Sequence, residues 1–214
     1  MAKIDQTIER LLADTAPAKP VTRPAASFGL WVLVTFVSTA CLVCFSAVRP
    51  DMAAQLASPL FLSEIATLFL LIISTALVAI WLCYPDLLQK RWVIYLPLLP
   101  LALFVVETIY RGLHPELSVV LPQDIDNGIN CVSCIAMYAL VPGFWMFYTL
   151  QRHATVYPRL AGAISLLAAS SIGLLILKFV EGNDPISHLL VWHITPVILL
   201  GCLGGFLGKK YLSW

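Results

Sequence analysis

The chain has 214 residues, of which 60% are hydrophobic and 12% are charged, and its net charge is +1. Soluble domains carry about 25% charged residues, so this composition excludes a soluble globular domain and indicates an integral membrane protein. The small net charge, without any basic run, also excludes a surface that binds nucleic acid directly.

Six apolar segments of about 20 residues are each long enough to cross the hydrocarbon core of a bilayer. They lack the alternating pattern of barrel strands, so they predict helices. We expect an all-α fold, an integral membrane bundle of six transmembrane helices, preceded by a short cytoplasmic amphipathic helix. The tail covers residues 1–27 and the transmembrane domain residues 28–214, with spans at about 28–48, 65–84, 92–110, 131–150, 160–179 and 188–207.

The basic residues divide unequally between the two sides of the predicted bundle. The tail, the second loop, the fourth loop and the C-terminus together hold ten of the thirteen Lys and Arg residues. The other side holds only Arg49, Arg111 and Lys178. The positive-inside rule therefore predicts that both termini are cytoplasmic.

The tail contains apolar residues at helical spacing, namely Ile4, Ile8, Leu11 and Leu12, with Asp5 and other charged residues between them. Pro17 and Pro20 end this pattern. Such a short helix is unstable alone in water, so its apolar stripe must be buried against a partner protein, the inner loops or the membrane. The mixed charge argues against the membrane surface, because lipid-binding helices are usually rich in Lys and Arg.

Cys131 and Cys134 form a Cys-x-x-Cys pair where the loop after the third span meets the fourth. Asn130 is a candidate N-cap, which would place Cys131 in the first helical turn, where the helix dipole favours a thiolate. The predicted topology puts both thiols at the outer surface, so the pair indicates redox or soft-metal chemistry. The alternative is that both are inert apolar residues of a membrane helix.

Other candidate residues have simpler interpretations. Cys41 and Cys44 repeat the spacing inside the first span, where packing is the default; a four-sulfur site with Cys131 and Cys134 is an alternative. Glu107 is either a functional intramembrane acid or a solvated helix end. His188 and His193 would lie about 140° apart on an α-helix, so the pair is not expected to bind one metal without other segments.

Four glycines in the last span, Gly201, Gly204, Gly205 and Gly208, form two overlapping small-xxx-small patterns. These patterns predict close packing against another helix. We prefer packing within one chain, and a homo-oligomer is the alternative.

No motif supplies a nucleophile–base pair or a phosphate-binding loop, so we expect no catalytic residue, no enzymatic activity, no cofactor and no resident metal site. The alternative is a membrane thiol–disulfide oxidoreductase coupled to quinone, with Cys131 and Cys134 as the exchanging pair. A quinone pocket has no specific signature in the sequence. A small transporter would require polar or broken helices at the midplane, and apart from Glu107 near one end the sequence of the spans shows none.

The order of several short motifs resembles the NrsF family of polytopic anti-sigma factors, the negative regulators of SigF. These motifs are the tail 5–12 with Pro20-Val21, Arg49-Pro50-Asp51, Tyr84-Pro85, the cysteine at the fourth span, Asp184-Pro185, Val191-Trp192-His193 and Gly204-Gly205. Family members pair this cysteine with another just after the fifth span, whereas residues 177–184 contain none here.

The resemblance implies an anti-sigma factor in the bacterial inner membrane. Its cytoplasmic tail would hold an extracytoplasmic-function sigma factor, and a periplasmic stress signal, an oxidant or a heavy metal, would release it. The implied docking residues are Ile4, Asp5, Ile8, Leu11, Leu12, Pro20 and Val21, and the implied sensing residues are Cys131 and Cys134.

Overall fold

The computed structural model describes residues 6, 9, 23–84, 90–114, 116, 125–153, 155–182 and 185–213. The described segments form helices long and apolar enough for six membrane spans, which confirms the predicted all-α fold. The elements are α2 (Pro24–Val43), the short α3 (Met52–Leu56), α4 (Pro59–Trp81), η2 (Arg91–Tyr95) with α5 (Leu98–Leu113), α6 (Ile125–Gln151), α7 (Pro158–Val180), and α8 (Ile186–His188), η4 (Leu189–Ile194) and α9 (Thr195–Tyr211) in one continuous span.

The structure does not describe the predicted docking residues, and the fourth helix starts earlier than predicted. The predicted docking residues Ile4, Asp5, Ile8, Leu11, Leu12, Pro20 and Val21 all lie outside the described residues. The fourth helix begins at Ile125, six residues before the predicted span, because hydropathy marks only its apolar part. Asn130 is therefore inside α6 and does not cap it, so the predicted first-turn position of Cys131 is wrong.

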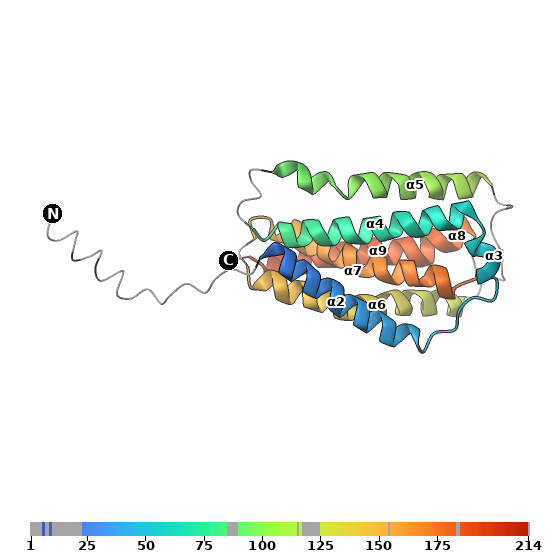
Figure 1. Ribbon diagram of the computed structural model, residues 1–214, viewed down its shortest axis with the longest axis horizontal. Coiled ribbons are helices and arrows are strands. Elements are labelled where there is room, and N and C mark those ends of the chain that lie inside the picture. The colour runs from blue at the N-terminus through green and yellow to red at the C-terminus, as the bar shows by residue number, and fades with distance from the viewer. Residues whose placement is uncertain are drawn as a thin grey trace.

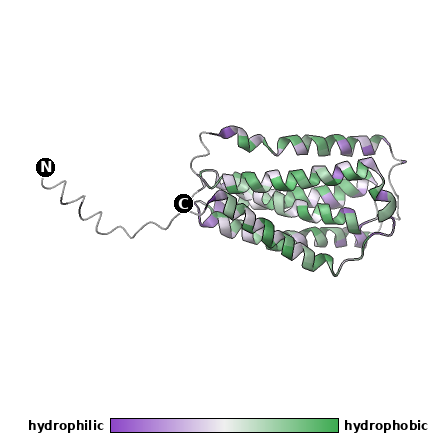
Figure 2. Ribbon diagram, in the orientation of Figure 1, coloured by the Kyte–Doolittle hydropathy of each residue, from purple (hydrophilic) through white to green (hydrophobic). Residues whose placement is uncertain are grey.

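The six spans run alternately in opposite directions, so the start of α2 and the end of α9 lie at the same end of the bundle (Figure 1). We call this the proximal end. The opposite end, where α2 finishes and α6 begins, is the distal end. Apolar residues cover much of the helix surfaces between the two ends (Figure 2), as lipid contact requires.

Helix α7 is the central helix of the bundle and packs against α4, α6 and α9. Its buried face consists largely of Ala, Gly and Ser, which let neighbouring backbones approach closely. The hydroxyls of Ser165, Ser170 and Ser171 bond to carbonyls one turn earlier in the same helix. These polar side chains are thus satisfied without a partner from another helix.

The glycines of the last span pack within the chain, as predicted. A Cβ on Gly204 would lie 2.3 Å from the carbonyl oxygen of Gly162, and a Cβ on Gly208 would lie 2.2 Å from that of Pro158. The α7 and α9 backbones therefore touch along this line. A Cβ on Gly205 would meet nothing closer than 3.6 Å, so this glycine is not required by the contact.

Helix α5 stands apart from the other spans (Figure 1). It packs mainly against α4 and α8, and a cavity of about 810 Å³ lies between α5 and the faces of α4, α7 and α9. The lining is almost wholly apolar, and Thr108 and Ser171 satisfy their hydroxyls on their own helices. This crevice has the chemistry of a lipid-filled space.

The glycine contact predicts a stability difference between neighbouring substitutions. Gly204→Ala should lower the free energy of unfolding by about 1–3 kcal/mol, because the added Cβ forces α7 and α9 apart. Gly205→Ala adds the same atom to the same helix with room to spare, and should change stability little. Thermal unfolding of both variants in detergent measures the difference; equal melting temperatures would contradict the contact.

Candidate functional site: a buried cysteine and histidine cluster

Cys131 lies two turns into α6 and is 2% exposed. Its Sγ donates a hydrogen bond to Oε2 of Glu181, at 3.0 Å, just after the end of α7. Its Sγ is also 3.7 Å from Nε2 of His188, in α8. Cys131 thus joins three segments at the distal end of the bundle.

His188 and His193 face each other because the intervening chain is a π-helix, η4. In a π-helix the backbone bonds span five residues and each turn holds more residues than in an α-helix, so residues five apart lie closer to the same side than the about 140° of an α-helix. The two ring centroids are 5.0 Å apart with the rings nearly perpendicular. The α-helical separation predicted from the sequence is therefore wrong.

Pro196 provides a physical reason for the π-helix. A proline has no N–H, and its ring clashes with the carbonyl four residues earlier, here that of Trp192. Widening the preceding turn relieves this clash. The hydroxyl of Thr195 bonds to the carbonyl of Leu190, five residues earlier, at 2.8 Å.

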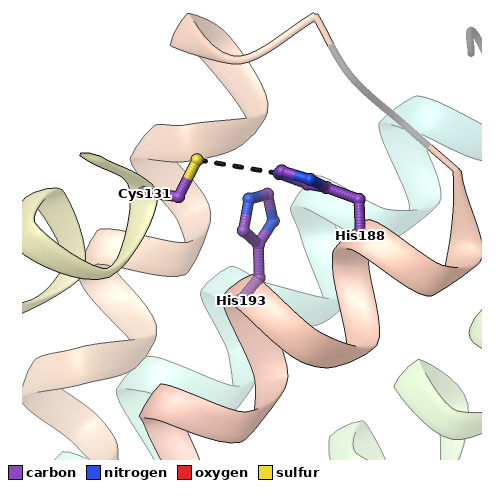
Figure 3. A group of neighbouring side chains, drawn as sticks. All are labelled: Cys131, His188 and His193. Carbon is purple, nitrogen blue, oxygen red and sulfur yellow. Dashed lines mark hydrogen bonds between the residues drawn. The ribbon is translucent and has the colours of Figure 1, made fainter. Parts of the chain in front are cut away.

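The side chains of Cys131, His188 and His193 converge in Figure 3. One potential ligand atom from each lies within 4.8 Å of the others, and all three residues are buried. His188 is 1% exposed and His193 5%. Sulfur and imidazole nitrogen are the donors that zinc and similar ions prefer, so the three side chains could hold such an ion.

The second predicted sensing residue, Cys134, is only partly buried and packs at the edge of the same apolar cluster. Cys131 and Cys134 are both free thiols. Among the described residues, no group of three or more potential metal ligands includes Cys41 or Cys44. The structure therefore gives the four-sulfur alternative no support.

A second polar cluster lies close by, at the same end of α7. Glu64 of α4 accepts two hydrogen bonds from the Arg111 guanidinium at 2.9 Å each, and one from the Lys178 ammonium at 2.8 Å. Arg111 belongs to α5 and Lys178 to α7, so this carboxylate connects three helices. The positive-inside rule places Arg111 and Lys178 on the outer side but does not predict their pairing with Glu64.

The third basic residue at the distal end, Arg49, is also paired. Its guanidinium donates to both carboxylate oxygens of Asp51, at 2.6 and 2.8 Å, and its backbone N–H donates to the carbonyl of Phe179. This guanidinium holds the pKa of Asp51 well below its ordinary value. All three basic side chains at the distal end therefore take part in ion pairs.

Glu107 is partly buried rather than fully solvated. One of its carboxylate oxygens accepts a hydrogen bond from Thr67 at 3.2 Å. The other oxygen is buried and has no hydrogen-bond partner among the described residues. Glu107 is therefore part of the distal polar region, beside the Glu64 cluster.

The fold and the site together define a polytopic helical membrane protein with a thiol–imidazole cluster at one end. The chain belongs to the NrsF family, described as negative regulator of sigma F, whose family model matches residues 11–214. This match covers nearly the whole chain and confirms the resemblance noted in the sequence. No match was found among curated proteins or among solved structures.

The burial of Cys131 predicts the order in which the two thiols react. In single-cysteine variants, a membrane-impermeant maleimide should label Cys134 faster than Cys131, because Cys131 is enclosed and bonded to Glu181. This is the reverse of the order that a first-turn Cys131 would give. Faster labelling of Cys131 would contradict the burial seen here.

Proposed function

We propose that this protein is an anti-sigma factor of the bacterial inner membrane, which sequesters an extracytoplasmic-function sigma factor and releases it on a periplasmic stress signal. The family match over residues 11–214 is the observation that carries the proposal, since the family is described as a negative regulator of sigma F. The six spans supply the membrane anchor.

The proposed orientation has the proximal end in the cytoplasm and the distal end in the periplasm. Ten of the thirteen Lys and Arg residues fall on the proximal side. The three on the distal side are in ion pairs, and the side chains of Arg111 and Lys178 are buried. The positive-inside rule counts Lys and Arg residues, so the ratio of ten to three favours a cytoplasmic proximal end.

The proposed docking element is the N-terminal tail, with Ile4, Ile8, Leu11 and Leu12 as an apolar stripe and Asp5, Pro20 and Val21 as further contacts. A short amphipathic helix of this kind gains stability by folding into an apolar groove of a partner. The partner's polymerase-binding surface would then be occluded. This tail is joined directly to α2, at the proximal end.

In this proposal the signal changes the contacts of the distal cluster, and α7 transmits that change to the proximal end. Lys178 and Glu181 lie at its distal end, and Gly162, at its proximal end, touches Gly204 and Gly208 of α9. Changing the tail from mostly bound to mostly free requires about 5.5 kcal/mol of differential free energy. A disulfide at the rim would be a marginal source of this energy, whereas a change in buried polar contacts is larger.

The proposal assigns no enzymatic activity to the protein. A thiol–disulfide oxidoreductase requires an exchanging pair that its substrate can reach, and Cys131 is 2% exposed. The oxidoreductase alternative therefore has no favourable observation among the described residues.

The docking proposal is tested by adding charge to the stripe. Ile8→Asp with Leu11→Asp should abolish co-purification of the sigma factor, because burying unpaired carboxylates costs several kcal/mol while a micromolar complex is worth about 8 kcal/mol. Gln6→Asp with Ala13→Asp is the matched control, since it adds equal charge to the opposite face of the predicted helix. Retention of the sigma factor by the stripe variant, measured on purified membranes, would refute the docking role.

A further inference from the structure

We propose that Cys131, His188 and His193, with Glu181 as the fourth donor, bind one divalent transition metal ion of the zinc type at the distal end. The metal site itself is independent of the sigma factor. Only its use as the periplasmic signal rests on the proposed function.

The distances between the donor atoms fit a metal site. In a tetrahedral zinc site with Zn–N of about 2.0–2.1 Å and Zn–S of about 2.3 Å, neighbouring donor atoms lie about 3.3–3.8 Å apart. The Sγ of Cys131 and Nε2 of His188 are already 3.7 Å apart, and the three potential donors are all within 4.8 Å of one another. Glu181 contacts the Cys131 Sγ at 3.0 Å but does not belong to this group of three, so the side chains of both His193 and Glu181 would have to move to complete a tetrahedral set.

The hydrogen bonding of His193 also favours a metal site. Nε2 of His193 is buried and has no hydrogen-bond partner among the described residues. His193 is 5% exposed, so bulk water has little access to hydrogen-bond this nitrogen. A buried polar atom without a partner is costly and needs an explanation, and coordination of a metal ion supplies one.

The backbone that holds His188 and His193 likewise favours a metal site. His188 and His193, which are five residues apart, face each other because η4 is a π-helix. This conformation is rare, and where it occurs it is often at a functional site. Trp192 lies between them and packs against α6 so tightly that a Cβ on Gly128 would fall 2.3 Å from its ring. The histidines are therefore held on a fixed element beside Cys131.

The charge of the four donors favours a divalent ion. Coordination requires the thiolate form of Cys131, so its proton passes to water as the metal binds. A thiolate and the Glu181 carboxylate carry two negative charges, and two neutral imidazoles add none. A divalent ion neutralises this set, which a buried site favours, whereas a monovalent ion leaves one negative charge uncompensated.

Metal binding would also change the contact that Cys131 makes with α7. In this structure the thiol donates a hydrogen bond to Glu181. Once the thiol has lost its proton, both groups bind the metal instead, which draws α6, the end of α7 and η4 together around one ion. Glu181 follows α7 directly and lies three residues after Lys178, so the Glu64 cluster lies next to this change.

The test is a titration of the purified intact protein in nanodiscs with Co²⁺, which reports tetrahedral zinc sites by its visible absorption. We expect one Co²⁺ per chain, with tetrahedral bands and a thiolate-to-cobalt charge-transfer band, and displacement by Zn²⁺. Cys131→Ser should remove the charge-transfer band, and His193→Gln should weaken binding at least about tenfold. Cys134→Ser is the matched control and should leave both binding and spectrum unchanged.

Absence of the bands in the native protein would overturn the proposal, as would a charge-transfer band that survives in Cys131→Ser. Because variants in a packed core can misfold, protection of the native thiol provides a second measurement. In the Cys134→Ser protein, Zn²⁺ should slow maleimide labelling of the peptide containing Cys131, because a thiolate held by the metal ion is not free to attack the maleimide. Unchanged labelling would likewise overturn it. Neither measurement involves the sigma factor, so a failed tail experiment and a failed metal site remain distinguishable.

Discussion

The buried carboxylate of Glu64 is the interaction on which the distal half of the bundle depends. It binds Arg111 of α5 and Lys178 of α7, and Glu64 and Lys178 are 3% and 6% exposed. Removing one partner of such a cluster leaves an unpaired charge in an apolar region, at a cost of about 3–5 kcal/mol. Because α5 has few other contacts with the bundle, this ion pair is its main polar attachment. The same carboxylate fixes the end of α7, from which Glu181 reaches Cys131.

Helix α7 connects this polar end to the opposite end of the protein. Its small residues bring it into contact with α4, α6 and α9 at once, and the glycine contact with α9 leaves no room for a side chain. Packed helices of this kind move as rigid elements rather than deforming gradually. Helix α7 therefore links the contacts of Glu181 and Lys178 to the α9 contact at the proximal end, whereas α2, which the N-terminal tail precedes, packs against α6 and α4.

The fold was predictable from the sequence because hydropathy and the positions of small residues determine spans and close contacts. The arrangement of the cysteine and histidine cluster was not. The turn before Pro196 is a π-helix, and this changes the expected placement of His188 and His193. The charges of Glu64, Arg111 and Lys178 were visible, but their pairing depends on the order of helices in the bundle. The family resemblance implies a cysteine just after the fifth span, and residues 177–184 of this chain contain none. Only the structure shows that the Glu181 carboxylate, in this segment, accepts a hydrogen bond from the Cys131 thiol.

The central claim is that the distal cluster controls the hold on the sigma factor. The most direct measurement is the amount of sigma factor retained by the intact protein in nanodiscs as Zn²⁺ is added, compared with the Cys131→Ser protein. We predict that Zn²⁺ lowers the retained fraction for the native protein and leaves it unchanged for Cys131→Ser. A native protein that binds the metal at this cluster and retains the sigma factor undiminished would contradict the account.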